Sequence, residues 1–175
     1  CEINGCSCTI GSMCNAMLTL DEAVFEETME TSIQSMGMER TMLEVVYPFL
    51  HKIGMMWQAG TINPAHEHFI THLIKQKLIT AISKIETPNP NLARKYMLFL
   101  PEGEAHELSL LFANYLIKSR GHHVLYLGPN LPYEDLFQVA SYYDPDYAIT
   151  FLITDTVFGD VNIMISKLLE NLPKW

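Results

Sequence analysis

Apolar residues in the first half of the chain recur at the spacing of amphipathic helices. The clearest helix begins after Asp21, a favourable N-cap residue, and we expect it to stop at Gly37. A shorter helix precedes it, around residues 13–20. Two more follow, one that Pro48 should kink or restart and one that Asn63 caps. The pattern therefore predicts a four-helix unit with short loops.

The pattern changes in the second half, where short apolar runs replace the long helical stretches. Three of these runs suit buried strands: YMLFL, HHVLYLG and YAITFLI. The segments between them have helical spacing, and this alternation predicts a parallel, doubly wound sheet. A further helix is expected over residues 160–172. Sheets of this type commonly have about five strands or more, so either the sheet looks cut short or its free edge is covered by something else.

The two halves are separated by residues 86–95, where the composition changes abruptly. This stretch has two prolines and two asparagines in ten residues, so we expect the domain linker there. The predicted domains are a helical bundle over residues 9–85 and an incomplete α/β domain over residues 95–175.

Composition indicates a globular chain and excludes some partners. The chain has 175 residues, of which 49% are hydrophobic and 18% charged, so it can bury a core. Its formal net charge is -9 and Lys and Arg form no cluster, so it has the wrong sign to hold a phosphate backbone unaided. No run reaches the ~18 apolar residues of a membrane helix, and no signal pattern opens the chain. We therefore expect a cytoplasmic protein with no membrane partner.

All four cysteines fall within the first 14 residues. Their spacing, C-x4-C-x-C-x5-C, matches neither a zinc-finger pair nor a known cluster motif. For this segment we favour a frayed linker with reduced thiols over a metal site; its cysteines are Cys1, Cys6, Cys8 and Cys14.

The first strand-to-helix loop, PEGEAHELS, lies where ligands bind in open parallel sheets. It lacks both glycine-rich patterns that cradle nucleotide phosphates. It offers Glu104 and His106 instead. A carboxylate beside an imidazole can fix which ring nitrogen carries the proton and leave the other for a metal. Taken alone, the pair is weak evidence and favours a surface histidine beside a carboxylate that caps the helix.

Glu67 occupies an unexpected position, on the axis of the apolar stripe of its helix. We expect its carboxylate to meet donors on another element or on a ligand, because burying it unpaired is costly. The alternative is that Glu67 caps its own helix. His68 borders the same stripe, and its spacing to His72 suits zinc, but no third ligand is evident. The stripe contains Ile70, Ile74, Leu78, Ala81 and Ile85.

Trp57 and the ten methionines are first interpreted as core residues, because Trp57 lies at helical spacing and methionine fills irregular gaps. The functional alternative is a soft apolar wall for a large, flat ligand.

Three motifs in register resemble one family. The first motif consists of Trp57, nine intervening residues and then Glu67-His68. It is similar to the cap signature of the light-sensing, adenosylcobalamin-dependent repressors of the MerR type. The stretch EAHELS resembles the cobalamin-binding E/D-x-H-x-x-G loop. The stretch GHHVLYLGPNLP is similar to the G-x-x-V-x-x-L-G-x-x-x-P segment that follows it. The resemblance covers residues 9–172 and implies a four-helix-bundle cap followed by a Rossmann-like (flavodoxin-like) parallel-sheet domain.

The resemblance also implies a ligand and roles for particular residues. Adenosylcobalamin or a related corrinoid would lie between cap and sheet, with His106 as the lower axial ligand to cobalt and Glu104 as its carboxylate partner. Trp57 would cover the upper face beside the adenosyl group, and Glu67 and His68 would contact that group or its surroundings.

At three positions the chain has a different residue from the family. Ser109, which we also assign to the cofactor site, replaces the loop Gly. Leu152 stands where the family's tail-binding Ser would fall, with Thr150 and Thr154 nearby, and Gln58 stands where light-sensing members have a His.

We therefore expect the ligand-sensing part of a MerR-type transcription regulator, and not an enzyme, because no nucleophile–base pair or open metal triad is evident. Family members form tetramers with cofactor in the dark and separate in light. The resemblance thus implies a homo-oligomer, a dimer or tetramer, that binds DNA only through an N-terminal helix-turn-helix domain lacking here. Two alternatives remain: a cofactor-free oligomerisation module of such a regulator, or a corrinoid carrier for methyl transfer.

Overall fold

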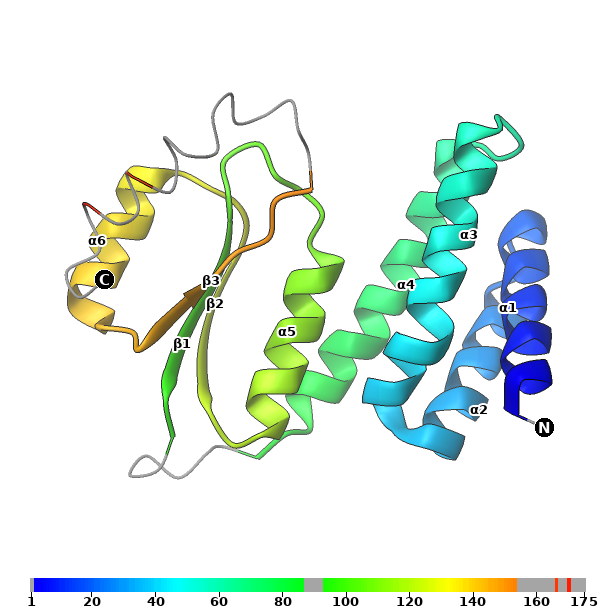
Figure 1. The fold of residues 1–175 in the computed structure, drawn as a ribbon, viewed down its shortest axis with the longest axis horizontal. Coiled ribbons are helices and arrows are strands. Elements are labelled where there is room, and N and C mark those ends of the chain that lie inside the picture. The colour runs from blue at the N-terminus through cyan, green and yellow to red at the C-terminus, as the bar shows by residue number, and fades with distance from the viewer. Residues whose placement is uncertain (1, 87–92, 154–165, 167–169, 171–175) are drawn as a thin grey trace. The chain divides into compact units, whose positions relative to one another are not determined.

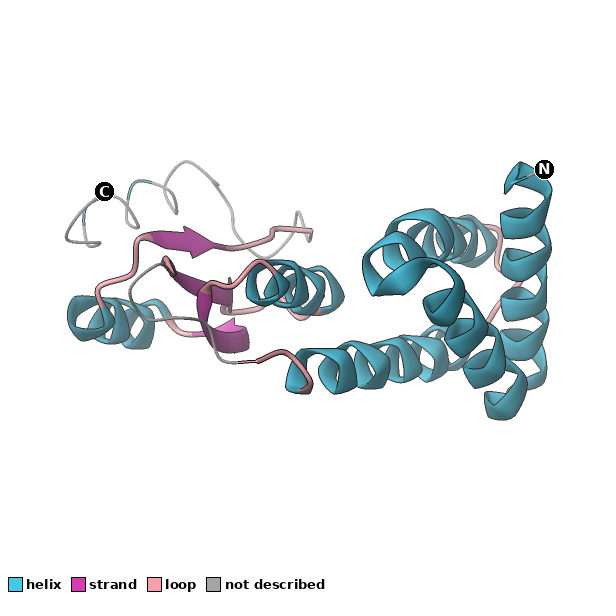
Figure 2. Cartoon of the chain, turned by 90° about the horizontal axis from the view of Figure 1, so that it is seen from below, coloured by secondary structure: helices cyan, strands magenta, loops and turns pink. Residues whose placement is uncertain are grey.

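The computed structural model describes residues 2–86, 93–153, 166 and 170. The chain divides into two compact units, Cys1–Ala81 and Ile82–Trp175. Figure 2 shows helices alone in the first unit and both helices and strands in the second. The predicted fold class, a helical unit followed by a parallel-sheet unit, is confirmed. The predicted linker falls largely on residues 87–92, outside the described residues.

The helical unit contains four α-helices and one short π-helix, as labelled in Figure 1 except for the π-helix. Their bounds are α1 Glu2–Thr19, α2 Glu22–Thr41, the π-helix Met42–Val46, α3 Tyr47–Gln58 and α4 Pro64–Ser83. Helix α2 begins as predicted, because the Asp21 side chain accepts a hydrogen bond from the N–H of Val24 at 3.1 Å.

Helix α1 is longer than predicted, and the expectation of a frayed linker before it is wrong. It begins at Glu2, so Cys8 and Cys14 are helical residues. Cys14 is 7% exposed, and burial raises the pKa of its thiol, whereas Cys8 is exposed. The linker prediction failed because it rested on cysteine spacing alone, whereas Met13 and Met17 of this helix are fully buried in the unit.

Gly37 ends a helical stretch, as predicted. Its backbone leaves helical geometry (φ 81°, ψ 162°), so α2 consists of two helices that meet at a kink. The second of them runs to Thr41 and on into the π-helix.

The predicted change at Pro48, a kink or a restart, coincides with the start of α3, because this proline lies in the first turn of that helix. Just before it, the N–H of Tyr47 donates to the carbonyl of Met42, five residues back. The hydrogen bonding of the helix therefore changes at this point.

The core of the helical unit is built largely from methionine and aromatic side chains, as predicted. The rings of Phe25 and Phe49 are both fully buried, with centroids 5.9 Å apart. Lys77 of α4 pairs with Glu26 of α2 at 2.5 Å, which ties the two helices together at the border of the core. The other large, fully buried side chains are Met13, Met17, Met29, Met42, Ile70, Ile74 and Leu78.

The second unit is a parallel sheet with a helix on each face. Its elements are β1 Lys95–Pro101, α5 Leu108–Ser119, β2 His123–Leu131, α6 Tyr133–Tyr143 and β3 Tyr147–Ile149. The strand order is β2-β1-β3 and both pairings are parallel, so β1 lies in the middle. The three predicted strands and the helices between them are confirmed. The helix predicted over residues 160–172 lies outside the described residues, except for Ser166 and Glu170, which are helical.

Alternate side chains of β1 explain why the two helices cover opposite faces. Met97 and Phe99 pack with Leu136 and Ala140 of α6. Leu98 and Leu100, which point the other way, pack with Leu110 of α5. All of these side chains are at most 1% exposed. The central strand therefore anchors both layers and holds the loops at the ends of the strands.

Among the helices of the described residues, none is both long and apolar enough to cross a bilayer.

Candidate functional site

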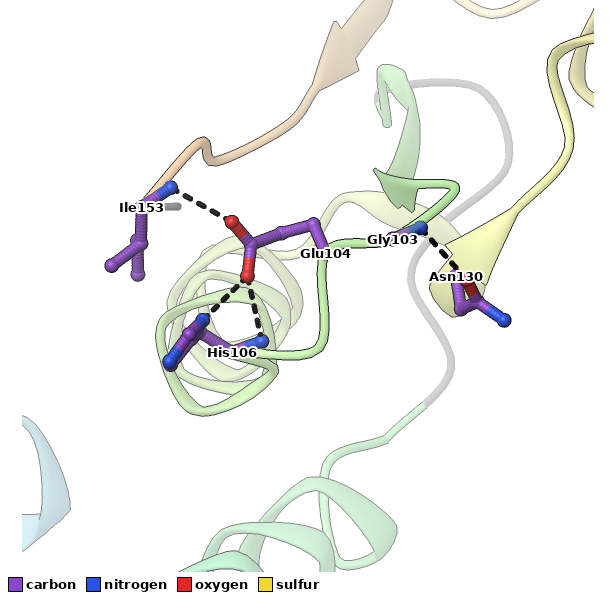
Figure 3. A network of polar contacts seen from close by, with 5 residues as sticks. All are labelled: Gly103, Glu104, His106, Asn130 and Ile153. Carbon is purple, nitrogen blue, oxygen red and sulfur yellow. Dashed lines mark hydrogen bonds and ion pairs between the residues drawn. The ribbon is translucent and has the colours of Figure 1, made fainter. Parts of the chain in front are cut away.

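The loop between β1 and α5 carries a buried carboxylate beside an exposed imidazole, at the carboxyl end of the central strand. Figure 3 shows this network. The side chain of Glu104 is 0% exposed, whereas that of His106 is 61% exposed. The carboxyl ends of parallel strands are where such sheets bind ligands. The structure therefore places the predicted Glu104–His106 pair in position to act as a site.

The Glu104 carboxylate accepts hydrogen bonds at both oxygens. Oε1 accepts from the backbone N–H of His106 at 3.0 Å and lies 2.6 Å from Nδ1 of the same residue. Oε2 accepts from the backbone N–H of Ile153, just beyond β3, at 2.9 Å. A buried carboxylate requires such donors to offset the loss of water. These contacts let Glu104 be buried and join its loop to the third strand.

The contact with Glu104 determines what the imidazole can do. In the neutral ring, a carboxylate at Nδ1 favours the tautomer whose proton is on Nδ1, so the lone pair is on Nε2. A histidine held in this way is a common metal ligand. Because most of the ring is exposed, a metal can approach Nε2 from solvent.

The number of donors shows which kind of metal would fit. Within residues 2–86 and 93–153, no group of three or more His, Cys, Asp or Glu side chains could hold a metal ion. A bare zinc ion needs about four ligands, most of them from the protein. A single imidazole suits a metal that arrives with its other positions already filled, as cobalt does in a corrin ring. His106 therefore fits a corrinoid, to whose cobalt it would supply one nitrogen.

Asn130 is a site residue that the sequence reasoning missed. Its side-chain Oδ1 accepts from the N–H of Gly103 at 2.8 Å, and its own N–H donates to the carbonyl of Glu104 at 3.2 Å. Gly103 and Asn130 both have left-handed backbones, with φ of 87° and 58°. The only available signal was an asparagine near the end of a predicted strand, because Gly103, which its side chain holds, lies 27 positions earlier in the sequence.

The same edge of the sheet also contains two polar side chains with different surroundings. Tyr126 donates to Oε1 of Glu107 at 2.8 Å. Burial, together with that hydrogen bond, raises the pKa of Tyr126 well above its usual range. By contrast, the buried Oγ1 of Thr150, next to the end of β3, has no hydrogen-bond partner among the described residues. A buried hydroxyl in this state is available to a ligand.

Two of the three residues that differ from the family motif are also located here. Ser109 lies in the first turn of α5 and is half-buried. Leu152, just past β3, is half-buried as well, whereas Thr154 lies outside the described residues.

Trp57 is not a core residue, contrary to its default interpretation. It lies at the end of α3 with 58% of its surface exposed. The reason is its position: the buried stripe of that helix ends at Ile53, one turn earlier, and the chain then turns at Gly60 (φ 67°). The indole is thus available as a flat apolar surface.

Glu67 is not buried either, and its recorded partners lie on its own helix. Its side chain is 42% exposed, accepts from Oγ1 of Thr71 at 2.9 Å and lies 3.3 Å from Nδ1 of His68. These partners differ from the expected donors on another element, and a donor on a ligand stays a prediction. His68 is 72% exposed, and within the described residues no metal-binding group includes it or His72.

The alternative role of Glu67, capping its own helix, is wrong as well. Asn63 accepts from the N–H of Ala65 at 2.8 Å and confirms the predicted cap. In return, the N–H of Asn63 donates to Nδ1 of His66 at 3.2 Å. His66 thus takes the place that a glutamate occupies in a capping box.

Comparison with known proteins gives the following matches. Residues 10–81, most of the helical unit, match the family model of the B12 binding domain. The chain is 24% identical over 163 residues to the HTH-type transcriptional repressor CarH of Myxococcus xanthus, which covers 93% of this chain and 54% of the repressor. A cobalamin-binding protein from Desulfitobacterium hafniense DCB-2 is 16% identical, with a TM-score of 0.42 over 92% of this chain and 77% of that one.

These matches confirm the resemblance to cobalamin-binding repressors that the sequence motifs predicted. The chain spans about half the length of the curated relative, 54% of it. That relative is named as a transcriptional repressor.

Proposed function

We propose that this chain is the ligand-sensing part of a transcription regulator and that it binds adenosylcobalamin or a related corrinoid, with His106 as an axial ligand to cobalt. The observation that carries the proposal is the buried Glu104 carboxylate 2.6 Å from Nδ1 of the exposed His106 ring. The match of residues 10–81 to the B12 binding domain supports the same ligand class independently of this loop.

Glu104 would keep the His106 ring in the state that coordination requires. By holding the proton at Nδ1, the carboxylate directs the lone pair at Nε2 outward and raises its basicity. Its second oxygen, bonded to the N–H of Ile153, fixes the carboxylate itself. The bound corrinoid would supply a cobalt centre whose upper bond can be broken, the chemistry that a light or ligand sensor uses.

We propose that Trp57, Glu67 and His68 also take part in binding the corrinoid. The exposed indole offers a flat apolar surface to it. The half-exposed Glu67 carboxylate can accept from donors such as ribose hydroxyls or an adenine amino group. Ser109 stands where the family motif has a glycine, so its side chain would take space beside a bound corrinoid.

The regulatory role would arise from a change in assembly. A ligand shifts a conformational or oligomeric equilibrium when it binds one state more tightly than the other. We propose that the bound corrinoid stabilises a homo-oligomer, a dimer or tetramer. A helix-turn-helix domain in the full-length protein would then link that oligomeric state to DNA binding. The net charge of -9 supports the view that the acidic part seen here does not bind DNA itself.

The proposal is tested by incubating the purified chain with adenosylcobalamin in the dark, separating free ligand by gel filtration and recording the visible spectrum of the protein fraction. We expect bound chromophore with the wild-type chain, and at least ~100-fold weaker binding with His106→Ala. His122→Ala is the matched control, because His122 lies at the opposite ends of the strands, beside Arg94, and should leave binding unchanged.

Three results would contradict the proposal. A wild-type chain that retains no chromophore would favour a cofactor-free module. Equal affinity of wild type and His106→Ala would remove His106 as the ligand. A chain that transfers a methyl group from its bound corrinoid would favour a carrier protein instead.

A further inference from the structure

The loop that carries Glu104 and His106 is fixed from the neighbouring strand at two points. Asn130, near the end of β2, accepts from the N–H of Gly103 through Oδ1 at 2.8 Å. Its own backbone N–H donates to the carbonyl of Glu104 at 3.2 Å. Figure 3 shows the first of these bonds beside the Glu104–His106 pair. One residue of β2 therefore contacts two consecutive residues of the β1–α5 loop.

The backbone of Glu104 is hydrogen-bonded through both its N–H and its carbonyl. The N–H of Glu104 donates to the carbonyl of Pro101 at 3.0 Å, and its carbonyl accepts from Asn130. The residue is thus held on both sides of its Cα, which determines where its side chain begins. The carboxylate then reaches His106 and Ile153 from that fixed origin.

Asparagine suits this position for two separate reasons. The backbone of Asn130 has φ of 58°, a region that only glycine, asparagine and aspartate enter readily. Its side chain also supplies the oxygen that Gly103 needs. Glycine would satisfy the first requirement alone, whereas alanine would satisfy neither.

We propose that Asn130 is a positioning residue for the His106 imidazole: through Gly103 and Glu104 it holds the carboxylate that keeps the ring proton on Nδ1. The value of this arrangement for ligand binding rests on the proposed function. The effect on the ring itself does not, because it can be measured in the ligand-free chain.

The test is NMR of the full chain with 15N-labelled histidine, in which long-range couplings report which ring nitrogen carries the proton. The His106 signals are assigned by their loss in His106→Ala. In the wild type we expect the Nδ1–H tautomer. Asn130→Gly keeps the left-handed backbone but removes the side-chain amide. In this variant we expect the ratio of the Nε2–H tautomer to the Nδ1–H tautomer to rise about fivefold, as expected for the loss of one hydrogen bond.

Two further variants separate positioning from general destabilisation. Asn130→Asp keeps both the backbone preference and an acceptor oxygen, so it should restore the wild-type tautomer. Asp144→Gly makes a glycine substitution at another left-handed residue, the C-cap of α6, with φ of 52°. It should leave the His106 signals unchanged while altering stability to a similar degree, as measured by urea unfolding of every variant.

Several outcomes would overturn the inference. A wild-type tautomer in Asn130→Gly would show that the loop holds Glu104 without Asn130. An equal change in Asp144→Gly would show a nonspecific effect, and failure of Asn130→Asp to restore the tautomer would show that the acceptor oxygen is not responsible.

The same variants separate this inference from the proposed function. If His106 binds cobalt, Asn130→Gly should weaken corrinoid affinity about tenfold or more, as expected when a residue that orients a metal ligand is lost. If the wild-type chain binds no corrinoid, the proposed function fails while the tautomer result still decides the role of Asn130.

Discussion

The two edges of the parallel sheet each hold a histidine by its Nδ1 atom, but in opposite ways. At the carboxyl edge, Nδ1 of His106 lies 2.6 Å from the buried Glu104 carboxylate. At the amino edge, Nδ1 of His122 accepts from the backbone N–H of Arg94 at 3.4 Å. The first contact favours a proton on Nδ1, and the second requires a lone pair there. The partner, and not the histidine itself, therefore decides which ring nitrogen could bind a metal.

The edges also differ in how their loops are fixed. The amino edge uses exposed contacts: Asp146 accepts from the N–H of Lys95 at 2.8 Å and pairs with Arg94 at 3.4 Å. The carboxyl edge uses a fully buried carboxylate. Exposed pairs contribute little to stability, whereas an unpaired buried donor is costly. Substitutions at the carboxyl edge should therefore have the larger effects.

The largest effect is expected for Glu104→Ala. This change removes the acceptor of the Ile153 and His106 backbone N–H groups, so it should destabilise the chain by about 1–3 kcal/mol in urea unfolding. It should also weaken corrinoid affinity about 10- to 100-fold. The control is Glu102→Ala, because Glu102 is an exposed glutamate of the same loop. Equal effects of the two variants would show that the buried carboxylate has no special role.

An intermediate effect is expected for Tyr126→Phe, which removes the hydrogen bond to Glu107. At neutral pH it should cost about 1 kcal/mol of unfolding free energy. The pH dependence follows from the raised pKa of Tyr126, caused first by burial. Above about pH 10 the unfolded chain releases this proton and the folded chain retains it, so wild-type stability should fall as pH rises.

Urea unfolding between neutral pH and pH 11 checks this prediction, since Tyr126→Phe cannot lose that proton. The variant should therefore lose less stability than the wild type over the alkaline range. Parallel losses in both chains would show that Tyr126 ionises normally in the folded state.

The smallest effect is expected at the amino edge, for Asp146→Asn. The Lys95 backbone N–H, and then the charge of Arg94, lower the pKa of the Asp146 carboxyl. A lowered pKa means that the carboxylate stabilises the fold above about pH 4 and loses this effect as pH falls through the folded-state value. Wild type and variant should thus differ slightly at pH 7 and converge in acid. A large difference at pH 7 would contradict the contrast between the edges.

Local sequence patterns were enough to predict the strands and most helices, because each depends on periodicity within one segment. The Asp21 and Asn63 caps are of this kind, since cap and helix are adjacent. The π-helix at Met42 was not predictable in this way. It depends on packing, and Met42 is fully buried within its unit.

The candidate site was predictable only in part, for a related reason. Glu104 and His106 were found because they are two residues apart in a strand-to-helix loop. Asn130 was missed because its contact with Gly103 spans two strands. Glu67 was misplaced because a helical wheel gives the direction of a side chain but not its depth, and the buried stripe of α4 begins only at Ile70.

The central claim is that a nitrogen of His106 binds cobalt, and the most direct measurement is electron paramagnetic resonance of the chain loaded with a Co(II) corrinoid. An axial nitrogen splits the cobalt signal, and replacing 14N with 15N turns each triplet into a doublet. We predict this change when the histidines of the chain are 15N-labelled, and its loss in His106→Ala. Triplets that persist in the labelled chain would contradict the claim, because the axial nitrogen would then belong to the corrinoid.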